Sequence, residues 1–214
     1  MKDCHPIDEL TRRYPALLPC AESLRLATEA VIACYRRGGK LLVCGNGGSA
    51  ADSQHIVGEL MKGFALPRKL DEATRQKLRA ACPGDVAALL ADRLQGALPA
   101  ISLVRETALS TAYANDAAPE LCFAQQVLGH GRPGDVLLCL STSGDSPNVL
   151  YAAHVAHARE MTVIGLTGRG GGKLRQLADI CVAAPAEETY QVQEYHLPLY
   201  HALCLAVERA FFAG

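Results

Sequence analysis

The stretch that most constrains the fold is a short apolar run that leads through a glycine-rich turn into a helical segment, between residues 40 and 60. Residues 41–44 have the length and flanking of a buried strand. The turn over residues 45–49 is made of small residues, and glycine lets the backbone take positive φ and approach a ligand closely. We expect a helix from residue 50 to about residue 61. Because the first amides of a helix are unpaired, this strand–turn–helix unit predicts an anion site.

Two side chains of this predicted helix suit chemistry. His55 and Glu59 are four residues apart, so they share one face of the helix. Such a pair can serve as metal ligands, but it occurs more often as a solvated face or a local hydrogen bond. The turn is neither a Walker A loop nor a full G-x-G-x-x-G fingerprint. Similar turns occur in α/β proteins without a ligand, so this unit alone leaves both interpretations open.

A second unit repeats the design. Residues 135–140 are a buried-strand candidate and run into a turn that contains Ser141, Thr142, Ser143 and Ser146. Pro147 then suits the first turn of a helix that continues to about residue 160. Hydroxyl groups and free helix amides together form a neutral nest for phosphate. The alternative is that these residues only cap the helix. Four hydroxyls in six residues favour phosphate.

The bulk properties exclude several classes of protein. At 214 residues the chain is expected to form one domain, 1–214, with a sizeable core. Net charge is −1 and Trp is absent, so nothing indicates nucleic acid or a charged membrane surface as partner. The first ten residues are polar and no apolar run could span a bilayer, so we expect no signal peptide and no membrane segment. Nine cysteines form no C-x-x-C pair, and we expect a reduced, cytoplasmic protein.

The rest of the chain alternates helices and strands. We expect N-terminal helices over 7–37, an inserted, surface-lying helical segment over about 64–96, a strand over 100–104, a helical turn over 107–113, a loop at 115–116, a helix over 120–128, strands over 162–166 and 180–183 with a short helix from 173 between them, and a last helix over about 188–212. Alternation of this kind, with continuous apolar strands, predicts an α/β fold with a parallel sheet covered on both faces. Ligands of such sheets sit beyond the carboxyl ends of the strands, where both polar turns lie.

The last predicted helix carries four further candidates, namely Gln193, Glu194, His196 and His201. Pro198 removes one helical hydrogen bond between them, and we expect it to distort the helix. Periodicity does not select ligands from this set.

Three segments and a short C-terminal motif together resemble a known family. They are GNGGSAADSQHIVGEL, GDVLLCLSTSGDSPNVL, VIGLTGRGGGKLRQLADI and QEYHLPLYH. In this order they resemble the SIS (sugar isomerase) domain, and within it the sedoheptulose-7-phosphate isomerases, or phosphoheptose isomerases. The resemblance covers most of the chain except the segment over about 64–96, which is longer than the usual family loop.

The resemblance implies a fold, an activity and a site. The fold would be a flavodoxin-like, three-layer αβα arrangement with a five-stranded parallel sheet, assembled as a homotetramer with active sites at subunit interfaces. The activity would be conversion of sedoheptulose 7-phosphate to D-glycero-D-manno-heptose 7-phosphate, toward the heptose of bacterial lipopolysaccharide. By motif position, zinc would bind His55, Glu59, Gln193 and His201; phosphate would bind Ser49, Ser141, Thr142, Ser143 and Ser146; Asn46, Asn115, Asp116 and Gln193 would contact the sugar; and Glu59 and His201 would be the acid/base pair.

Two departures from the isomerase pattern keep other functions open. The isomerases usually carry an acidic residue three positions before the ligand glutamine, where this chain has Tyr190. A branch of SIS proteins that binds the replication initiator also lacks that acid. The second departure is the segment over 64–96, which follows the Glu59 helix and could reshape the sugar pocket. The alternatives are therefore a regulatory SIS protein, or an isomerase of another sugar phosphate.

Overall fold

A five-stranded parallel sheet forms the centre of the computed structural model, which describes residues 4–213. The strands are β1 (Leu41–Gly45), β2 (Ala100–Ser102), β3 (Val136–Ser141), β4 (Thr162–Thr167) and β5 (Ile180–Ala183), in the order β2-β1-β3-β4-β5. Every neighbouring pair is parallel. Gly45 of β1 is in register with Leu140 of β3, so the two polar turns leave the sheet side by side. The α/β fold predicted from the sequence is confirmed.

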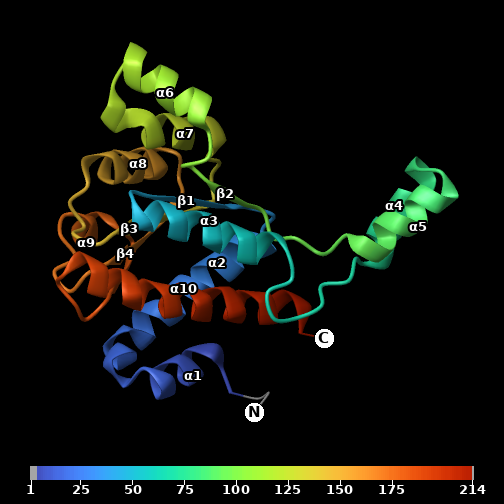
Figure 1. The fold of residues 1–214 in the computed structure, drawn as a ribbon, viewed down its shortest axis with the longest axis horizontal. Helices are drawn as coiled ribbons and strands as arrows, with labels where there is room; N and C mark the ends of the chain where they lie inside the picture. The colour runs from blue at the N-terminus through green and yellow to red at the C-terminus, as the bar shows by residue number, and fades with distance from the viewer. Residues whose placement is uncertain (1–3, 214) are drawn as a thin grey trace.

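Helices cover both faces of the sheet, because alternate strand residues point to opposite sides. Leu41 and Val43 pack in one core with residues of α1 (Pro6–Arg13), α2 (Ala21–Arg36), α3 (Gly48–Met61) and α10 (Thr189–Phe212). Leu42 and Cys44 pack in a second core with residues of α7 (Cys122–His130), α8 (Pro147–Ala158) and α9 (Leu174–Leu177). These are the three layers of Figure 1.

The N-terminal region is helical, as expected. The helices over 7–37 are α1, the short 3₁₀ helix η1 (Pro15–Cys20) and α2. Pro15 occupies the start of η1 and Pro19 lies inside it. Neither proline has a backbone N–H to donate, so neither can extend an α-helical ladder from the preceding turn.

The segment over 64–96 is helical, as expected, and contains two short helices. They are α4 (Glu72–Ala81) and α5 (Gly84–Arg93), which project from the body of the molecule as an arm (Figure 1). α4 has no buried residue and α5 has only Ala87. An antiparallel bridge between Lys69 and Gln95 closes the base of the arm.

Three local expectations between β2 and β3 differ from the structure. β2 ends at Ser102, not at residue 104, and α6 (Thr107–Asp116) is a full helix followed by η2 (Pro119–Leu121) and α7. Asn115 and Asp116 therefore lie in the last turn of α6 and not in a loop. At the other end of the chain, α10 continues as one helix through Pro198.

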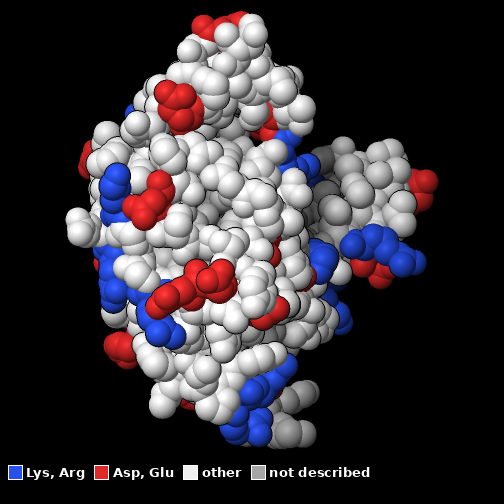
Figure 2. Space-filling model, turned by 60° about the vertical axis from the view of Figure 1, so that its left-hand side comes forward, with Lys and Arg blue, Asp and Glu red and all other residues white. Residues whose placement is uncertain are grey.

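The surface and the cysteines match the composition. Basic and acidic side chains are interspersed among uncharged ones on the face shown in Figure 2. All nine cysteines are free thiols, and five of them are buried, where they pack as small apolar side chains. Within residues 4–213, no helix is long and apolar enough to cross a membrane.

Candidate active site

The first polar turn brings the start of α3 against the end of β1. Gly47 has φ 55° and precedes the first residue of α3, a conformation that L side chains rarely adopt. Ser49 is buried and packs on Gly45, where an added Cβ would lie 2.8 Å from the Cβ of Ser49. Asn46 is exposed at the tip of the turn. The predicted phosphate residue of this turn, Ser49, is therefore buried, whereas Asn46 faces solvent.

The second polar turn holds its hydroxyls in a network of its own. The Oγ atoms of Ser141 and Ser146 lie 3.1 Å apart, and the amide of Gly144 donates to Ser141 Oγ over 3.1 Å. The amide of Asp145 donates to Ser143 Oγ over 3.2 Å. Ser146 precedes α8, but its side chain makes no capping hydrogen bond to that helix. This weakens the interpretation that the hydroxyls serve only as caps.

A pair of amides joins the two turns. Asn46 donates to the Oδ1 of Asn148 over 2.9 Å, and Asn148 donates back to the Oδ1 of Asn46 over the same distance. Asn148 lies in the first turn of α8. It was not among the residues predicted from the sequence, because the partnership spans 102 positions of the chain.

Three predicted residues from two helices lie together. Nε2 of His55 is 3.1 Å from Oε1 of Glu59 on α3. The ring of His201, from α10, packs edge-on against the ring of His55 with centroids 5.0 Å apart. Burial lowers the pKa of His201 below its ordinary 6.5; His55 lowers it further and Glu59 raises it. An imidazole and a carboxylate are thus neighbours, and side chains of both kinds can act as general acids or bases.

The other predicted residues lie apart from this cluster. Gln193 lies over the start of α3, where a Cβ on Gly48 would come within 2.6 Å of its Nε2. Asn115 donates to Asp116 over 2.8 Å, and both are exposed. No hydrogen bond within residues 4–213 joins these two to the turns or to the cluster. Thr142 is half-buried beside Ser141.

Three further residues touch the cluster and were missed from the sequence. Nζ of Lys62 lies 3.2 Å from Oε2 of Glu59. The hydroxyl of Tyr200 donates to Asp52 Oδ1 over 3.1 Å and lies 3.0 Å from Nδ1 of His55. Asp52 is three residues before His55 in α3, a spacing that the sequence does display. Tyr200 gives no such signal, because it comes from the other end of the chain.

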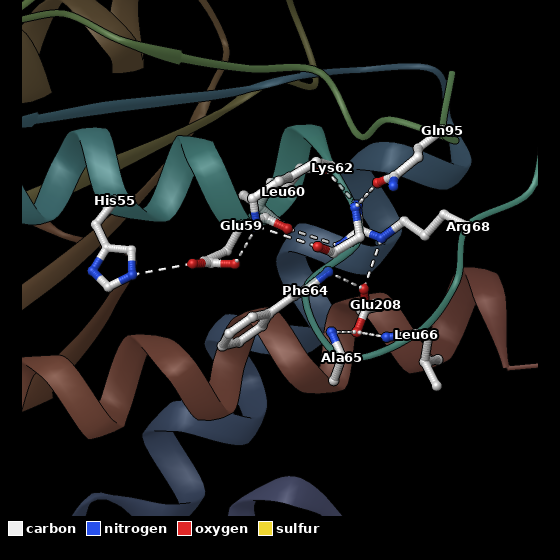
Figure 3. Close-up of polar contacts among 11 residues, drawn as sticks. His55, Glu59, Leu60, Lys62, Phe64, Ala65, Leu66, Arg68, Gln95 and Glu208 are labelled. Carbon is white, nitrogen blue, oxygen red and sulfur yellow. Dashed lines mark hydrogen bonds and ion pairs between the residues drawn. The ribbon is translucent and has the colours of Figure 1, made fainter. Parts of the chain in front are cut away.

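A buried ion pair anchors the end of α3 to α10 (Figure 3). Nε of Arg68 donates to Glu208 Oε1 over 2.8 Å, and neither side chain is exposed. The guanidinium also donates to the carbonyls of Leu60 and Glu59, over 2.6 and 2.8 Å. These carbonyls are in the last turn of α3, where no further helical N–H is available. Arg68 thus fixes the backbone of the catalytic candidate Glu59.

The residues of this cluster can be compared with the ligands of a zinc site. Two imidazoles, a carboxylate and an amide oxygen are ligands that zinc accepts. Nε2 of His201 is buried without a hydrogen-bond partner within residues 4–213, which is the state expected of an atom whose partner is a bound cation. In the described part of the chain, however, no three His, Cys, Asp or Glu side chains are grouped as a metal site. The chemical types of these donors are therefore those that zinc accepts, but the side chains are not arranged as a coordination shell.

Comparison with known proteins places this chain in a family. The family model of the SIS domain matches residues 17–82 and 87–168, and its gap falls within the arm. The chain is 41% identical over 191 residues to a phosphoheptose isomerase from Rhodospirillum rubrum, covering 89% of this chain and 87% of that protein. It is 38% identical over 213 residues to a phosphoheptose isomerase from Laribacter hongkongensis, covering 98% and 95%.

A solved structure agrees. The phosphoheptose isomerase of Neisseria gonorrhoeae is 34% identical and superimposes with a TM-score of 0.73 over 94% of each chain. Sequence and fold coincide over nearly the whole length, so the chain belongs to the SIS domain family and, within it, to the phosphoheptose isomerases.

Proposed function

We propose that this protein isomerises sedoheptulose 7-phosphate to D-glycero-D-manno-heptose 7-phosphate. The observation that carries the proposal is the meeting of Glu59 with the two imidazoles of His55 and His201, on helices that run beside the polar turns. An aldose–ketose isomerase needs one group to take a proton from carbon and another to return it. The relatives, which are phosphoheptose isomerases, support the choice of substrate.

The chemistry moves one proton between neighbouring carbons. A base removes a proton from C1 of the ketose, and the electron pair forms the C1–C2 double bond of an enediol while the C2 oxygen gains a proton. A proton then adds to C2, and the C1 hydroxyl loses its proton as C1 becomes the aldehyde. Glu59 and His201 are the proposed acid/base pair. Which of them takes the first proton is left open by their positions.

The turns hold the other end of the substrate. Ser49, Ser141, Thr142, Ser143 and Ser146 are proposed to bind the phosphate through hydroxyls and amides. Asn46, Asn115, Asp116 and Gln193 are proposed to contact the sugar. Binding energy at the phosphate orients C1 and C2 at the proton-transferring groups.

Zinc is part of the proposal. His55, Glu59, Gln193 and His201 would hold it, and it would polarise the substrate carbonyl as a Lewis acid. The unpartnered Nε2 of His201 and the donor chemistry of the set support this choice. Glu59 and His201 are thus proposed both as zinc ligands and as the acid/base pair. A carboxylate that holds zinc tightly is a poor free base, so the two residues divide these roles between them.

A homotetramer in the cytoplasm is proposed as the working form. In the single chain Asn46, His55, Asn115 and Asp116 are exposed, whereas a reactive enediol needs an enclosed site. A second copy of the chain would supply the missing walls. The product would be a precursor of the heptose in bacterial lipopolysaccharide.

The test is a coupled assay with sedoheptulose 7-phosphate, joined to metal analysis and a screen of five- to seven-carbon sugar phosphates. We expect turnover and bound zinc in the wild type. Glu59→Gln should lower kcat by about 10²–10⁴-fold and leave the fold intact. Glu29→Gln, an exposed carboxylate on α2, is the control and should match the wild type. A Glu59→Gln protein with wild-type turnover would overturn the acid/base assignment.

The second candidate is a regulatory SIS protein that binds a sugar phosphate or another protein. Tyr190 favours it, because this residue is 61% exposed at a position where the isomerases usually carry an acid. A wild-type protein that binds sugar phosphates, holds no zinc and turns over none of them would establish this alternative. Bound zinc and turnover of a different sugar phosphate would instead correct the substrate.

A further inference from the structure

Asp52, Tyr200 and His55 form a short hydrogen-bonded chain behind the proposed zinc site. Asp52 and His55 lie on one face of α3, and α10 places Tyr200 between them. The Tyr200 hydroxyl is 3.1 Å from Oδ1 of Asp52 and 3.0 Å from Nδ1 of His55. Tyr200 is only 2% exposed, so its hydroxyl has no easy exchange of partners with solvent.

When Asp52 is ionised, the number of protons in this chain sets the direction of its hydrogen bonds. An ionised carboxylate only accepts hydrogen bonds, and a tyrosine hydroxyl has one proton to donate. The Tyr200 proton therefore goes to Asp52. The contact between Tyr200 and His55 then requires Nδ1–H of the imidazole to donate to the phenolic oxygen. A neutral imidazole carries one proton, so its lone pair is left on Nε2.

The position of the proton on Nδ1 matters because Nε2 of His55 lies beside the carboxylate of Glu59. Nε2 of His55 is 3.1 Å from a carboxylate oxygen of Glu59, and His201 adds a second nitrogen that is buried without a partner. In this tautomer Nε2 of His55 and the Glu59 carboxylate are both acceptors and lie 3.1 Å apart, which favours a cation between them. A ring with its proton on Nε2 would point that proton at the place where the cation binds.

We propose that Asp52 and Tyr200 are positioning residues that hold the proton of His55 on Nδ1 and turn its Nε2 lone pair toward the metal. This inference rests on the zinc site of the proposed function. Hydrogen bonds from the far nitrogen of a ligand histidine commonly fix its tautomer and orientation in metal proteins. Here the acceptor is a tyrosine oxygen, polarised in turn by a carboxylate.

The test begins with Tyr200→Phe, which removes one oxygen and keeps the ring that packs edge-on against both His55 and His201. Zinc affinity is measured by competition with a chelator in the absence of sugar. We expect it to fall by about 10–100-fold, with kcat falling alongside and KM unchanged, since the phosphate turns are untouched. In the zinc-loaded protein, ¹⁵N NMR should show the Nδ1–H of His55 hydrogen-bonded in the wild type and not in the variant.

Asp52→Ala separates a directed chain from simple packing. It keeps the tyrosine hydroxyl but frees its proton for Nδ1 of His55, so zinc affinity should fall as in Tyr200→Phe. The double variant should lose no more than either single one, because the two residues act as a unit. Tyr35→Phe is the control: Tyr35 is also buried, and its hydroxyl has no partner within residues 4–213. It should bind zinc as the wild type does.

The outcomes keep this inference apart from the isomerase assignment. Wild-type zinc affinity in Tyr200→Phe, or additive losses in the double variant, would overturn the positioning role even if the wild type isomerises the substrate. A third outcome is that the wild type binds zinc but turns over no sugar phosphate, and that Tyr200→Phe binds zinc more weakly. This would support the positioning role and refute the proposed activity. A wild type that does not bind zinc would overturn the positioning role.

Discussion

Nε of Arg68 and Oε1 of Glu208 lie 2.8 Å apart with neither side chain exposed. Glu208 also accepts the amides of Phe64, Ala65 and Leu66. Arg68→Ala would leave this carboxylate without its charge partner and two helix-end carbonyls without a donor. We expect it to lower the free energy of unfolding by about 3–5 kcal/mol, measured by urea denaturation. The loss should also reduce turnover, because Arg68 holds the carbonyl of Glu59.

A matched control comes from the arm. Arg79 and Glu72 form an ion pair in which both side chains are 59% exposed. Arg79→Ala should change stability much less than Arg68→Ala, because exposed pairs contribute little. Equal effects of the two substitutions would show that the buried pair is not an anchor of α3.

His196 predicts how stability depends on pH. It is fully buried on α10, with Nε2 3.2 Å from the carbonyl of Thr167, and burial lowers its pKa from 6.5 to about 4. Between these values the unfolded chain binds a proton that the folded chain does not. Stability should therefore fall as pH drops from 6.5 toward 4, by about 3 kcal/mol from this residue. His196→Gln retains a donor for Thr167 but does not titrate, so its stability should fall less over the same range. The urea midpoints of both proteins at pH 7 and pH 5 measure this difference. Equal losses of stability in the wild type and in His196→Gln would contradict the prediction.

Sequence patterns predict those parts of the fold whose residues are contiguous in the chain. The apolar runs of β1 and β3 and the small residues that follow them are contiguous in sequence, and the structure has both units where they are expected. Pro15 and Pro19 can also be seen in the sequence. Their missing N–H groups account for the 3₁₀ segment between α1 and α2.

Pairings between distant residues could not be predicted in this way. Arg68 meets Glu208 across 140 positions, and Tyr200 meets Asp52 across 148. Nothing in the spacing of α3 reveals which side chains α10 will bring to it. Spacing marks His55 and Glu59 as a pair on α3, but the choice of Gln193 and His201 on α10 rests on the family resemblance, and the residues that support all four appear only in three dimensions.

Gly48 tests the place of Gln193. An added Cβ there would lie 2.6 Å from Nε2 of Gln193, the end of a flexible side chain. Gly48→Ala should therefore fold, displace the Gln193 amide and weaken zinc binding and kcat. Gly58→Ala, in the same helix, is the control because its Cβ would meet nothing within 4 Å. It should raise stability by up to about 1 kcal/mol and leave turnover unchanged. Zinc affinity of Gly48→Ala equal to that of Gly58→Ala would argue against Gln193 as a ligand.

The arm tests how far the body of the molecule depends on the inserted segment. Lys69 and Gln95 already pair at its base, and the amide of Gly96 donates to the carbonyl of Arg68 over 2.7 Å. Replacing residues 70–94 with an Asn-Gly turn should close this base as a hairpin. The shortened protein should unfold at a urea concentration close to that of the wild type, because the two arm helices contribute one buried side chain between them.

Turnover should persist in the shortened protein, because none of the proposed site residues lies between 70 and 94. The measurement is kcat and KM for sedoheptulose 7-phosphate, with circular dichroism as the control for folding. A folded variant with wild-type zinc content but no turnover would assign the arm to the substrate site, where it would act by covering the sugar bound to its own or a neighbouring copy. A variant that fails to fold would show that the arm, despite its exposure, stabilises the end of α3.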